Sequence, residues 1–141
     1  MMKVNIIYWT GTGNTEEMAN LLAKGVKEAG AELTIKTVGE SSKEDITNCD
    51  LVMLGSPAMG SEVIEEMEME PFIEEIKEVV SGKDMILFGS YGWGTGEWME
   101  LWEERMEGYG ANLVKNGVIT NEFPEGEERE KLIEIGRSIV K

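Results

Sequence analysis

The feature that most constrains the fold of this chain is a regular alternation between short apolar segments and longer amphipathic ones. Five short segments rich in aliphatic and β-branched residues predict strands, at residues 3–9, 32–38, 51–55, 85–89 and 112–119. Four longer segments carry apolar side chains at helical spacing and predict helices, at residues 15–29, 63–80, 96–107 and 127–140. Pro71 interrupts the second of these, so we expect that helix either to break in two or to start late, near the proline.

Strands that alternate with helices of this length form βαβ units, whose right-handed crossovers build a mostly parallel sheet with helices on both faces. The segment 32–38 alternates apolar with polar residues, which is typical of a half-exposed edge strand. No linker or repeat divides the chain, so we expect one α/β domain of three layers over residues 1–141. In such a doubly wound sheet, ligands bind at the carboxyl ends of the strands, where the strand order reverses.

The composition excludes several kinds of chemistry. The chain has no histidine and a single cysteine, Cys49, which excludes a Ser-His-Asp triad, His-ligated zinc, redox-active cysteine pairs and cysteine-ligated iron–sulfur clusters. Its 28 acidic and 13 basic side chains leave a net charge of −15, which repels nucleic acid and anionic lipid. No segment approaches the roughly 18 apolar residues of a membrane span, and no signal-peptide pattern is present. We therefore expect a soluble, cytoplasmic monomer without a metal, in which Cys49 is a structural thiol.

The loop after the first strand is typical of a phosphate-binding turn. Thr10, Gly11, Thr12, Gly13, Asn14 and Thr15 lie between that strand and the first helix. The two glycines let the backbone approach a ligand closely, and the helix N-terminus presents free N–H groups with a partial positive charge. Neither a Walker A loop nor a dinucleotide-binding loop fits, because the lysine and the third glycine are missing. The alternative is an ordinary capped turn in which Asn14 or Thr15 is the N-cap.

Two further loops are expected at the same edge of the sheet. The first contains Ser56, Pro57, Ala58, Met59, Gly60, Ser61 and Glu62, and the second contains Ser90, Tyr91, Gly92, Trp93 and Gly94. Trp93 between two glycines favours a planar ligand stacked on its ring, with the alternative that it fills the core. Met59 could stack on that ligand or cover the core, and Glu62 could accept a hydrogen bond from a ring N–H or begin the next helix. Residues 59–62 predict a type II′ β-turn, because Gly60 holds the first central position.

A ligand with a phosphate at one end and a planar ring at the other has the form of FMN, and here the sequence resembles a known family, the short-chain flavodoxins of clostridia and related anaerobes. The matching segments are YWTGTGNTE at 8–16, PAMGSE at 57–62, EPFIEEI at 70–76, FGSYGWGTGEWM at 88–99 and NEFPE at 121–125. Together they cover nearly the whole chain. The resemblance implies a flavodoxin-like doubly wound fold, with a five-stranded parallel sheet in the order 2-1-3-4-5.

The resemblance also implies roles for individual residues. Residues 10–15 would bind the FMN phosphate, while Met59 and Trp93 would cover the two faces of the flavin. Glu62 would accept a hydrogen bond from the flavin N3–H, and Asn121 would lie near the dimethylbenzene side. The peptide between Gly60 and Ser61 would flip on one-electron reduction, so that the Gly60 carbonyl accepts a hydrogen bond from the flavin N5–H and stabilises the neutral semiquinone.

The function that the resemblance implies is low-potential one-electron transfer between semiquinone and hydroquinone, with no catalytic residues. Between Lys43 and Lys77 the chain has ten acidic residues and no basic one, which disfavours the anionic hydroquinone and suits redox partners with basic docking patches, such as ferredoxin-type oxidoreductases. Two alternatives stay open, an FMN-dependent NAD(P)H:quinone reductase-like enzyme and a dedicated activator of a radical enzyme. A phosphorelay receiver domain is excluded, since the acidic residues that it needs after the first and third strands are missing.

Overall fold

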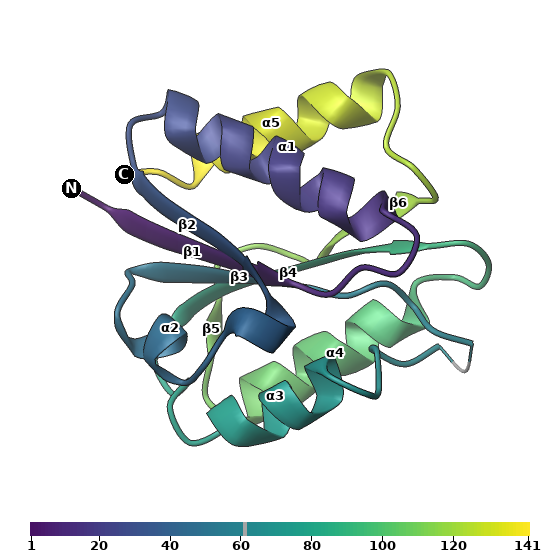
Figure 1. Cartoon of the computed structure of the whole chain (residues 1–141), viewed down its shortest axis with the longest axis horizontal. Coiled ribbons are helices and arrows are strands. Elements are labelled where there is room, and N and C mark those ends of the chain that lie inside the picture. Colours follow the sequence, from purple (N-terminus) through teal and green to yellow (C-terminus); the bar gives the residue numbers. More distant parts are fainter. Residues whose placement is uncertain (61) are drawn as a thin grey trace.

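The computed structural model describes residues 1–60 and 62–141 and has three layers, a central sheet with helices on both faces (Figure 1). The strands are β1 (Lys3–Tyr8), β2 (Glu32–Thr37), β3 (Leu51–Gly55), β4 (Asp84–Tyr91), β5 (Asn112–Leu113) and β6 (Val118–Asn121). They pair in parallel in the order β2-β1-β3-β4-β5, and β6 also pairs with β4. The doubly wound fold with strand order 2-1-3-4-5 is therefore confirmed.

The helices cover the two faces in pairs. They are α1 (Asn14–Glu28), α2 (Glu44–Thr47), α3 (Met69–Ile76), α4 (Glu97–Gly108) and α5 (Glu127–Ser138), and a 3₁₀ turn, η1 (Val38–Glu40), follows β2. α1 and α5 lie on one face of the sheet, and α3 and α4 lie on the other (Figure 1). α3 starts two residues before Pro71, so the late start is confirmed, with the proline in the first turn where its missing N–H is tolerated. The four residues of α2 are too few to show helical periodicity in the sequence.

The fifth strand differs from the prediction of one strand over residues 112–119. It is split into β5, which pairs with the start of β4, and β6, which pairs with the end of β4. Between them the Gly117 N–H donates to Glu103 Oε2 on α4, at 2.9 Å. A Cβ at Gly117 would lie 2.4 Å from Met99 Cγ, so the backbone here packs directly on α4. The chain leaves the sheet because α4 binds its backbone in place of β4.

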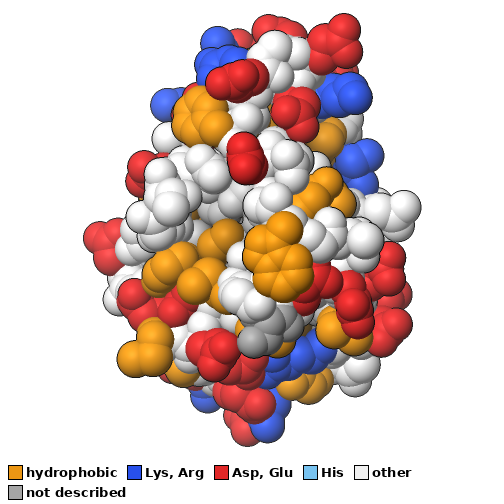
Figure 2. Space-filling view, turned by 90° about the vertical axis from the view of Figure 1, so that its right-hand side faces the viewer, with side chains coloured by type: hydrophobic (Ala, Val, Ile, Leu, Met, Phe, Trp, Pro, Cys, Tyr) orange, Lys and Arg blue, Asp and Glu red, His pale blue; other side chains and the backbone are white. Residues whose placement is uncertain are grey.

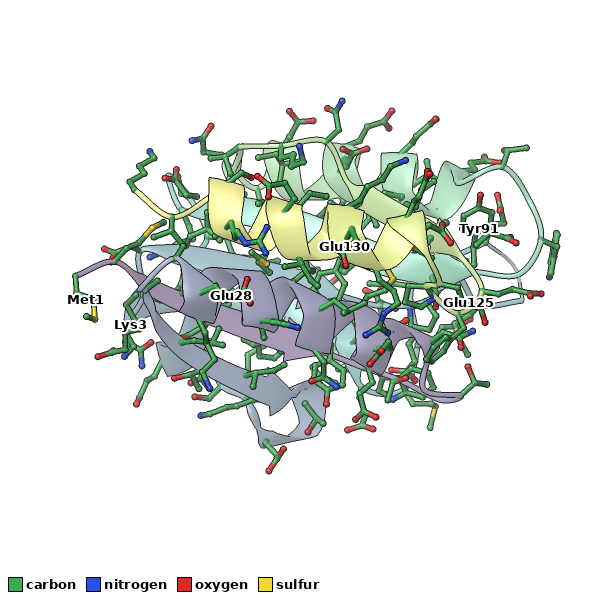
Figure 3. All side chains as sticks on the ribbon, turned by 90° about the horizontal axis from the view of Figure 1, so that it is seen from above. Met1, Lys3, Glu28, Tyr91, Glu125 and Glu130 are labelled. Atoms are coloured by element: carbon green, nitrogen blue, oxygen red, sulfur yellow. The ribbon has the colours of Figure 1, made fainter. Side chains whose placement is uncertain are left out.

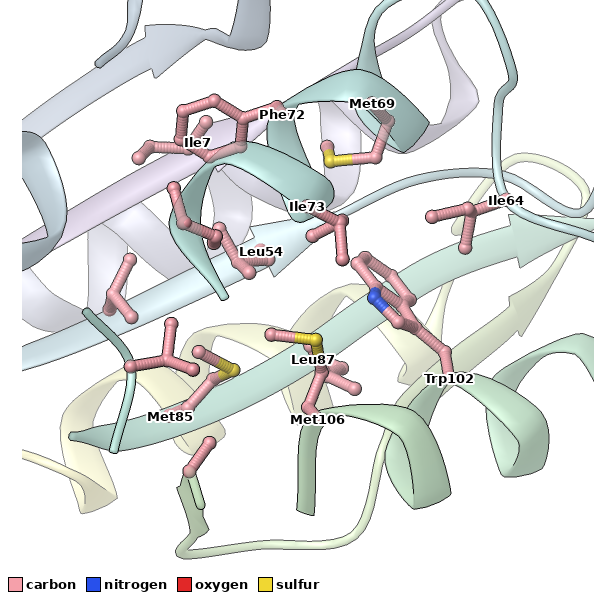
Figure 4. Packing of buried hydrophobic residues seen from close by; sticks show 14 of the residues in the cluster. Ile7, Leu54, Ile64, Met69, Phe72, Ile73, Met85, Leu87, Trp102 and Met106 are labelled. Atoms are coloured by element: carbon pink, nitrogen blue, oxygen red, sulfur yellow. The ribbon is translucent and has the colours of Figure 1, made fainter. Parts of the chain in front are cut away.

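Apolar cores lie on both faces of the sheet. Successive strand residues point to opposite faces, so Ile6 enters the core under α1 and α5 while Ile7 enters the core against α3 and α4. Figure 4 shows the second core, which includes strand residues Ile7, Leu54, Met85 and Leu87 and helix residues Met69, Phe72, Ile73, Trp102 and Met106. Because both faces are covered, the central strands are continuous apolar runs in the sequence. Cys49 is buried in this second core, and burial raises the pKa of its thiol.

α1 and α5 pack at close range because each has a glycine at the contact. Seen from above, the two helices run side by side over the sheet (Figure 3). A Cβ at Gly25 would lie 1.9 Å from the Ile133 carbonyl oxygen, and one at Gly136 would lie 2.2 Å from the Leu22 carbonyl oxygen. A methyl group at either position therefore forces the two helices apart.

Gly25→Ala is expected to lower the free energy of unfolding by about 1–3 kcal/mol, because overpacking outweighs the higher helix propensity of alanine, which is worth about 1 kcal/mol. Gly108→Ala is the matched control, since a Cβ there, also in a helix, has no neighbour within 4 Å. That variant should be as stable as the wild type or more stable. Urea unfolding followed by circular dichroism measures both, and equal midpoints for the two variants would contradict a tight contact between α1 and α5.

Candidate functional site

The carboxyl ends of β1, β3 and β4 open onto a cavity of about 510 Å³, a volume typical of small-molecule sites. Figure 3 places Tyr91 at this end of the molecule, opposite Met1 and Lys3. The cavity is lined by Trp9, Thr10, Gly11, Thr12, Asn14, Thr15, Pro57, Ala58, Met59, Ser90, Tyr91, Gly92, Glu122 and Phe123. The three loops expected at this edge of the sheet therefore meet at one site.

Most predicted site residues line this cavity, while Glu62 lines a smaller neighbouring cavity. Gly13, Ser56, Gly60, Glu62, Trp93, Gly94 and Asn121 are not among the described residues of the larger cavity's wall, and Ser61 lies outside the described residues. Sequence reasoning missed Trp9, Glu122 and Phe123. An aromatic residue directly before a glycine-rich loop was a usable signal for Trp9. No local pattern singled out Phe123, since its position depends on the backbone of the preceding residue.

The side chain of Thr10 stabilises the loop after β1. Its Oγ1 accepts hydrogen bonds from the Gly13 N–H at 3.1 Å and from the Glu16 N–H at 3.4 Å. The N-cap of α1 is Gly13, at φ +96°, and it makes no side-chain cap bond. The alternative N-cap at Asn14 or Thr15 is therefore wrong. Thr15 Oγ1 instead lies 2.8 Å from Ser90 Oγ in a buried contact, which ties the start of α1 to the end of β4.

The loop after β1, where the sequence predicts phosphate binding, is an uncharged turn of a kind that suits an anion, and we call it the cradle. It combines the hydroxyls of Thr10 and Thr12 with the backbone at the N-terminus of α1, whose dipole favours negative charge. Among the described residues of the cavity wall, the only charged one is Glu122. Behind the cradle, the Tyr8 hydroxyl donates to Glu16 at 3.0 Å, and burial, together with this bond, raises the pKa of Tyr8. The arrangement suits a phosphate ester bound by uncharged donors.

The Glu62 N–H donates a hydrogen bond of 2.8 Å to the Met59 carbonyl oxygen, the bond expected of a β-turn that starts at Met59. The predicted type II′ is wrong, because the φ of Gly60 is not positive. The left-handed conformation falls on Glu62, at φ +53°. The Glu62 carboxylate lies against Gly94 on the next loop, where a Cβ would come within 1.8 Å of Oε1. That buried Oε1 has no hydrogen-bond partner among the described residues, so it is a free acceptor.

Trp93 and Met59 lie outside the two cores. The Trp93 side chain is 65% exposed, so the alternative that it fills the core is wrong. Met59 is half-buried on the cavity wall and belongs to neither core cluster. Figure 2 faces this end of the molecule and shows hydrophobic side chains gathered near its middle, with Asp and Glu side chains around them.

The chain after β6 closes the remaining side of the cavity. The Asn121 side-chain amide and the Glu122 N–H both donate to the Tyr91 carbonyl oxygen, at 3.3 Å and 2.8 Å. Glu122 takes a left-handed conformation, with φ +58°, that few non-glycine residues adopt. Phe123 follows it onto the cavity wall, where its side chain is 44% exposed. On this side of the cavity the resemblance implied Asn121, but the wall residue is the aromatic Phe123.

Comparison with known proteins agrees with this geometry. A family model described as Flavodoxin matches residues 6–136. The flavodoxin of Clostridium beijerinckii is 48% identical over 136 residues, which cover 96% of this chain and 98% of that protein. The chain belongs to the flavodoxin family. The flavodoxin of Megasphaera elsdenii is 44% identical over 122 residues, which cover 86% of this chain and 88% of that protein. The solution structure of its two-electron reduced form matches with a TM-score of 0.86 and 42% identity, over 96% of this chain and 98% of that one.

Flavodoxins are electron carriers that contain FMN. FMN is therefore confirmed as the cofactor, and the prediction that the protein is an electron carrier, not an enzyme, is confirmed as well. The residues present fit FMN. The neutral cradle at α1 suits its phosphate. The unpartnered Oε1 of Glu62 is an acceptor of the kind that the ring N–H requires, although the Glu62 side chain lines a neighbouring cavity and not this one. In residues 1–60 and 62–141 no helix is long and apolar enough to cross a membrane. The same residues contain no group of three or more His, Cys, Asp or Glu side chains placed to hold a metal ion.

Thr12→Val should weaken FMN binding about tenfold, because it removes an exposed hydroxyl from the cradle and a hydrogen bond to a charged group is worth about 1.5–3 kcal/mol. Riboflavin lacks the phosphate, so its affinity should be the same for variant and wild type. Quenching of flavin fluorescence on binding to the FMN-free protein measures both constants. An equal loss of affinity for the two ligands would place the phosphate elsewhere.

Proposed function

We propose that this flavodoxin is a low-potential one-electron carrier whose FMN cycles between semiquinone and hydroquinone. The observation that supports this most directly is the charge around the cavity. Its described wall has no Lys or Arg, and the chain as a whole has a net charge of −15. An electron that adds negative charge here is opposed by the surroundings and is readily given up to an acceptor.

The size of this effect follows from Coulomb's law. One negative charge at about 10 Å disfavours a second by roughly 0.4 kcal/mol in water-like surroundings, and salt screens part of it. Several such charges sum to about 1–2 kcal/mol, or about 40–90 mV for one electron. The acidic side chains therefore lower the potential of the second reduction step without contacting the flavin.

The first reduction step is proposed to depend on the peptide between Gly60 and Ser61. A flip of this peptide would turn the Gly60 carbonyl toward the flavin N5–H, a bond that exists only after reduction. Gly60 is exposed, and a Cβ there would have no neighbour within 4 Å, so this side of the peptide has room to turn. Glycine adopts both turn conformations with little strain. The Ser61 half of the peptide lies outside the described residues.

Met59 and Trp93 are proposed to cover the two faces of the flavin. They lie on the loops after β3 and β4, and both side chains are outside the cores. A quinone reductase-like enzyme needs room over one flavin face for a second ring, and two covers leave none. A dedicated activator of a radical enzyme would use the same site and differ only in its partner.

The proposed partners are redox proteins with basic docking patches, such as ferredoxin-type oxidoreductases. Figure 2 shows hydrophobic side chains near the middle of this face, with Asp and Glu side chains and some Lys and Arg around them. Together with the net charge of −15, this suits an encounter steered by charge. Trp93 and Phe123, exposed by 65% and 44%, are the aromatic residues of this end that a partner can reach. A cytoplasmic location and a monomeric state stay predictions.

An anaerobic reductive titration followed by visible absorption tests the proposed function. We expect two separate one-electron steps, with a long-wavelength band of the neutral semiquinone between them. Gly60→Val should lower the amount of semiquinone at half reduction several-fold, because a β-branched residue resists the change of turn conformation. Direct conversion to the two-electron form in the wild type would favour the hydride-transfer enzyme.

Electron transfer to a basic redox protein should slow as ionic strength rises, because salt screens the attraction that brings the two proteins together. A stopped-flow series at several salt concentrations, with cytochrome c as a basic acceptor, measures this dependence. Glu66→Lys reverses one exposed charge and should flatten the salt dependence. A rate that does not change with salt would argue against docking steered by charge.

A further inference from the structure

The loop that contains Met59 and Glu62 begins at the buried residue Ser56, and its far end is hydrogen-bonded back to Ser56. Ser56 follows β3, is fully buried, and its N–H donates to the Phe88 carbonyl oxygen at 3.1 Å. Its Oγ accepts a hydrogen bond of 3.0 Å from the Glu65 N–H, and its carbonyl oxygen accepts one of 3.3 Å from Trp98 Nε1. The chain that leaves β3 at Ser56 thus returns to the same place at Glu65, and we call this Ser56–Glu65 contact the base of the loop.

Glu65 is itself fixed by an unusual use of its carboxylate. The residue is 2% exposed. Oε2 accepts from the Met67 N–H at 2.6 Å, and Oε1 accepts from the N–H groups of Glu68 and Met69 at 2.7 Å and 2.9 Å. Met69 is the first residue of α3, so the carboxylate closes the N-terminus of that helix, where negative charge is stabilised. Three N–H donors on one carboxylate leave Glu65 a single orientation.

The loop has few other attachments. At its start the Ala58 N–H donates to the Ser90 carbonyl oxygen at 2.9 Å. Within it, the Met59 N–H donates to Val63 at 2.8 Å, and the Glu62 N–H closes the turn on Met59. The start of the loop is therefore tied to β4, while its end is tied through the hydrogen bonds of Glu65 and through Ile64, which is 5% exposed and packs in the second core. A loop with one end free samples many more conformations than a closed one.

We propose that Glu65 is a positioning residue for the FMN site. By fixing the end of the loop, it holds Met59 and Glu62 in the places from which they contact the flavin, although its own carboxylate points to α3. The proposal rests on the proposed function for its redox consequence, but its structural part does not. The competing interpretation is that Glu65 only caps α3 and leaves the turn unaffected.

Amide hydrogen exchange of the FMN-free protein separates the two interpretations. Glu65→Gln keeps the shape of the side chain but removes acceptor capacity, so exchange should speed up about tenfold or more at residues 67–69 and also at Met59 and Glu62. Glu66→Gln is the matched control, an exposed neighbour with the same loss of charge, and should change these rates less than about twofold. Faster exchange confined to residues 67–69 would overturn the proposal.

Ser56→Ala removes the contact between Ser56 and Glu65 by changing Ser56 in place of Glu65. It removes the acceptor of the Glu65 N–H but leaves the carboxylate bonds to α3. Exchange should therefore speed up at Met59 and Glu62 and stay unchanged at residues 67–69. If Glu65→Gln does not fold, this variant decides alone, and unchanged exchange at Met59 and Glu62 overturns the proposal.

The FMN-loaded proteins provide the redox readout. Glu65→Gln should weaken FMN binding about tenfold and bring the two reduction steps closer together, whereas Glu66→Gln should leave FMN binding unchanged and shift the second step only by the small effect of one exposed charge. Equal shifts in both variants would mean that only charge matters, and would overturn the positioning role. A wild-type protein that binds no FMN would contradict the proposed function, while the exchange rates of the FMN-free protein would still test the link between Glu65 and the turn.

Discussion

The pairing of β3 between β1 and β4 is the interaction on which the site depends. Its register sets Gly55 level with Tyr8 on one side and with Phe88 on the other. Because the three parallel strands are in register at these residues, the loops that follow them lie side by side. The cradle, the turn and the loop of Trp93 therefore meet at one cavity. The cores on both faces hold that register, because a slip of one residue would turn every strand side chain to the opposite face.

An anionic cofactor binds to an acidic chain only where contacts at short range outweigh repulsion at long range. In the proposed site, the hydroxyls of the cradle and the N-terminus of α1 would meet the phosphate directly, while most of the acidic side chains are at the surface and screened by salt. The electron added to the flavin ring has no such cradle. Under the proposed function, affinity for FMN and resistance to reduction are set by different groups, so one chain can combine binding of an anionic cofactor with a low potential.

Local rules were enough to predict the alternation of elements, the loop after β1 and its direct passage into a helix. They failed where a residue distant in the sequence determines the local structure. Glu103 of α4 binds the Gly117 N–H and splits the fifth strand, and Ser90 engages Thr15 so that it does not cap its own helix. Phe123 reaches the cavity because Glu122 bonds to Tyr91 in a left-handed conformation. No pattern within the surrounding residues encodes any of these partners.

The acidic residues between positions 62 and 70 show most clearly that the role of a side chain depends on its burial and partners, which the sequence alone does not reveal. These glutamates look alike in the sequence, yet Glu68 accepts a bond from Trp9 Nε1, Glu70 pairs with Arg105, and Glu65 is buried without any cation. A buried carboxylate needs donors, and here the N–H groups of Met67, Glu68 and Met69 supply them, just before α3 and at its first residue. Pro71, which has no N–H, lies just beyond those groups. Under the proposed role of Glu65, the helix start and the loop geometry are coupled, because moving α3 by one residue would take the donors from Glu65 and release the turn that carries Met59 and Glu62.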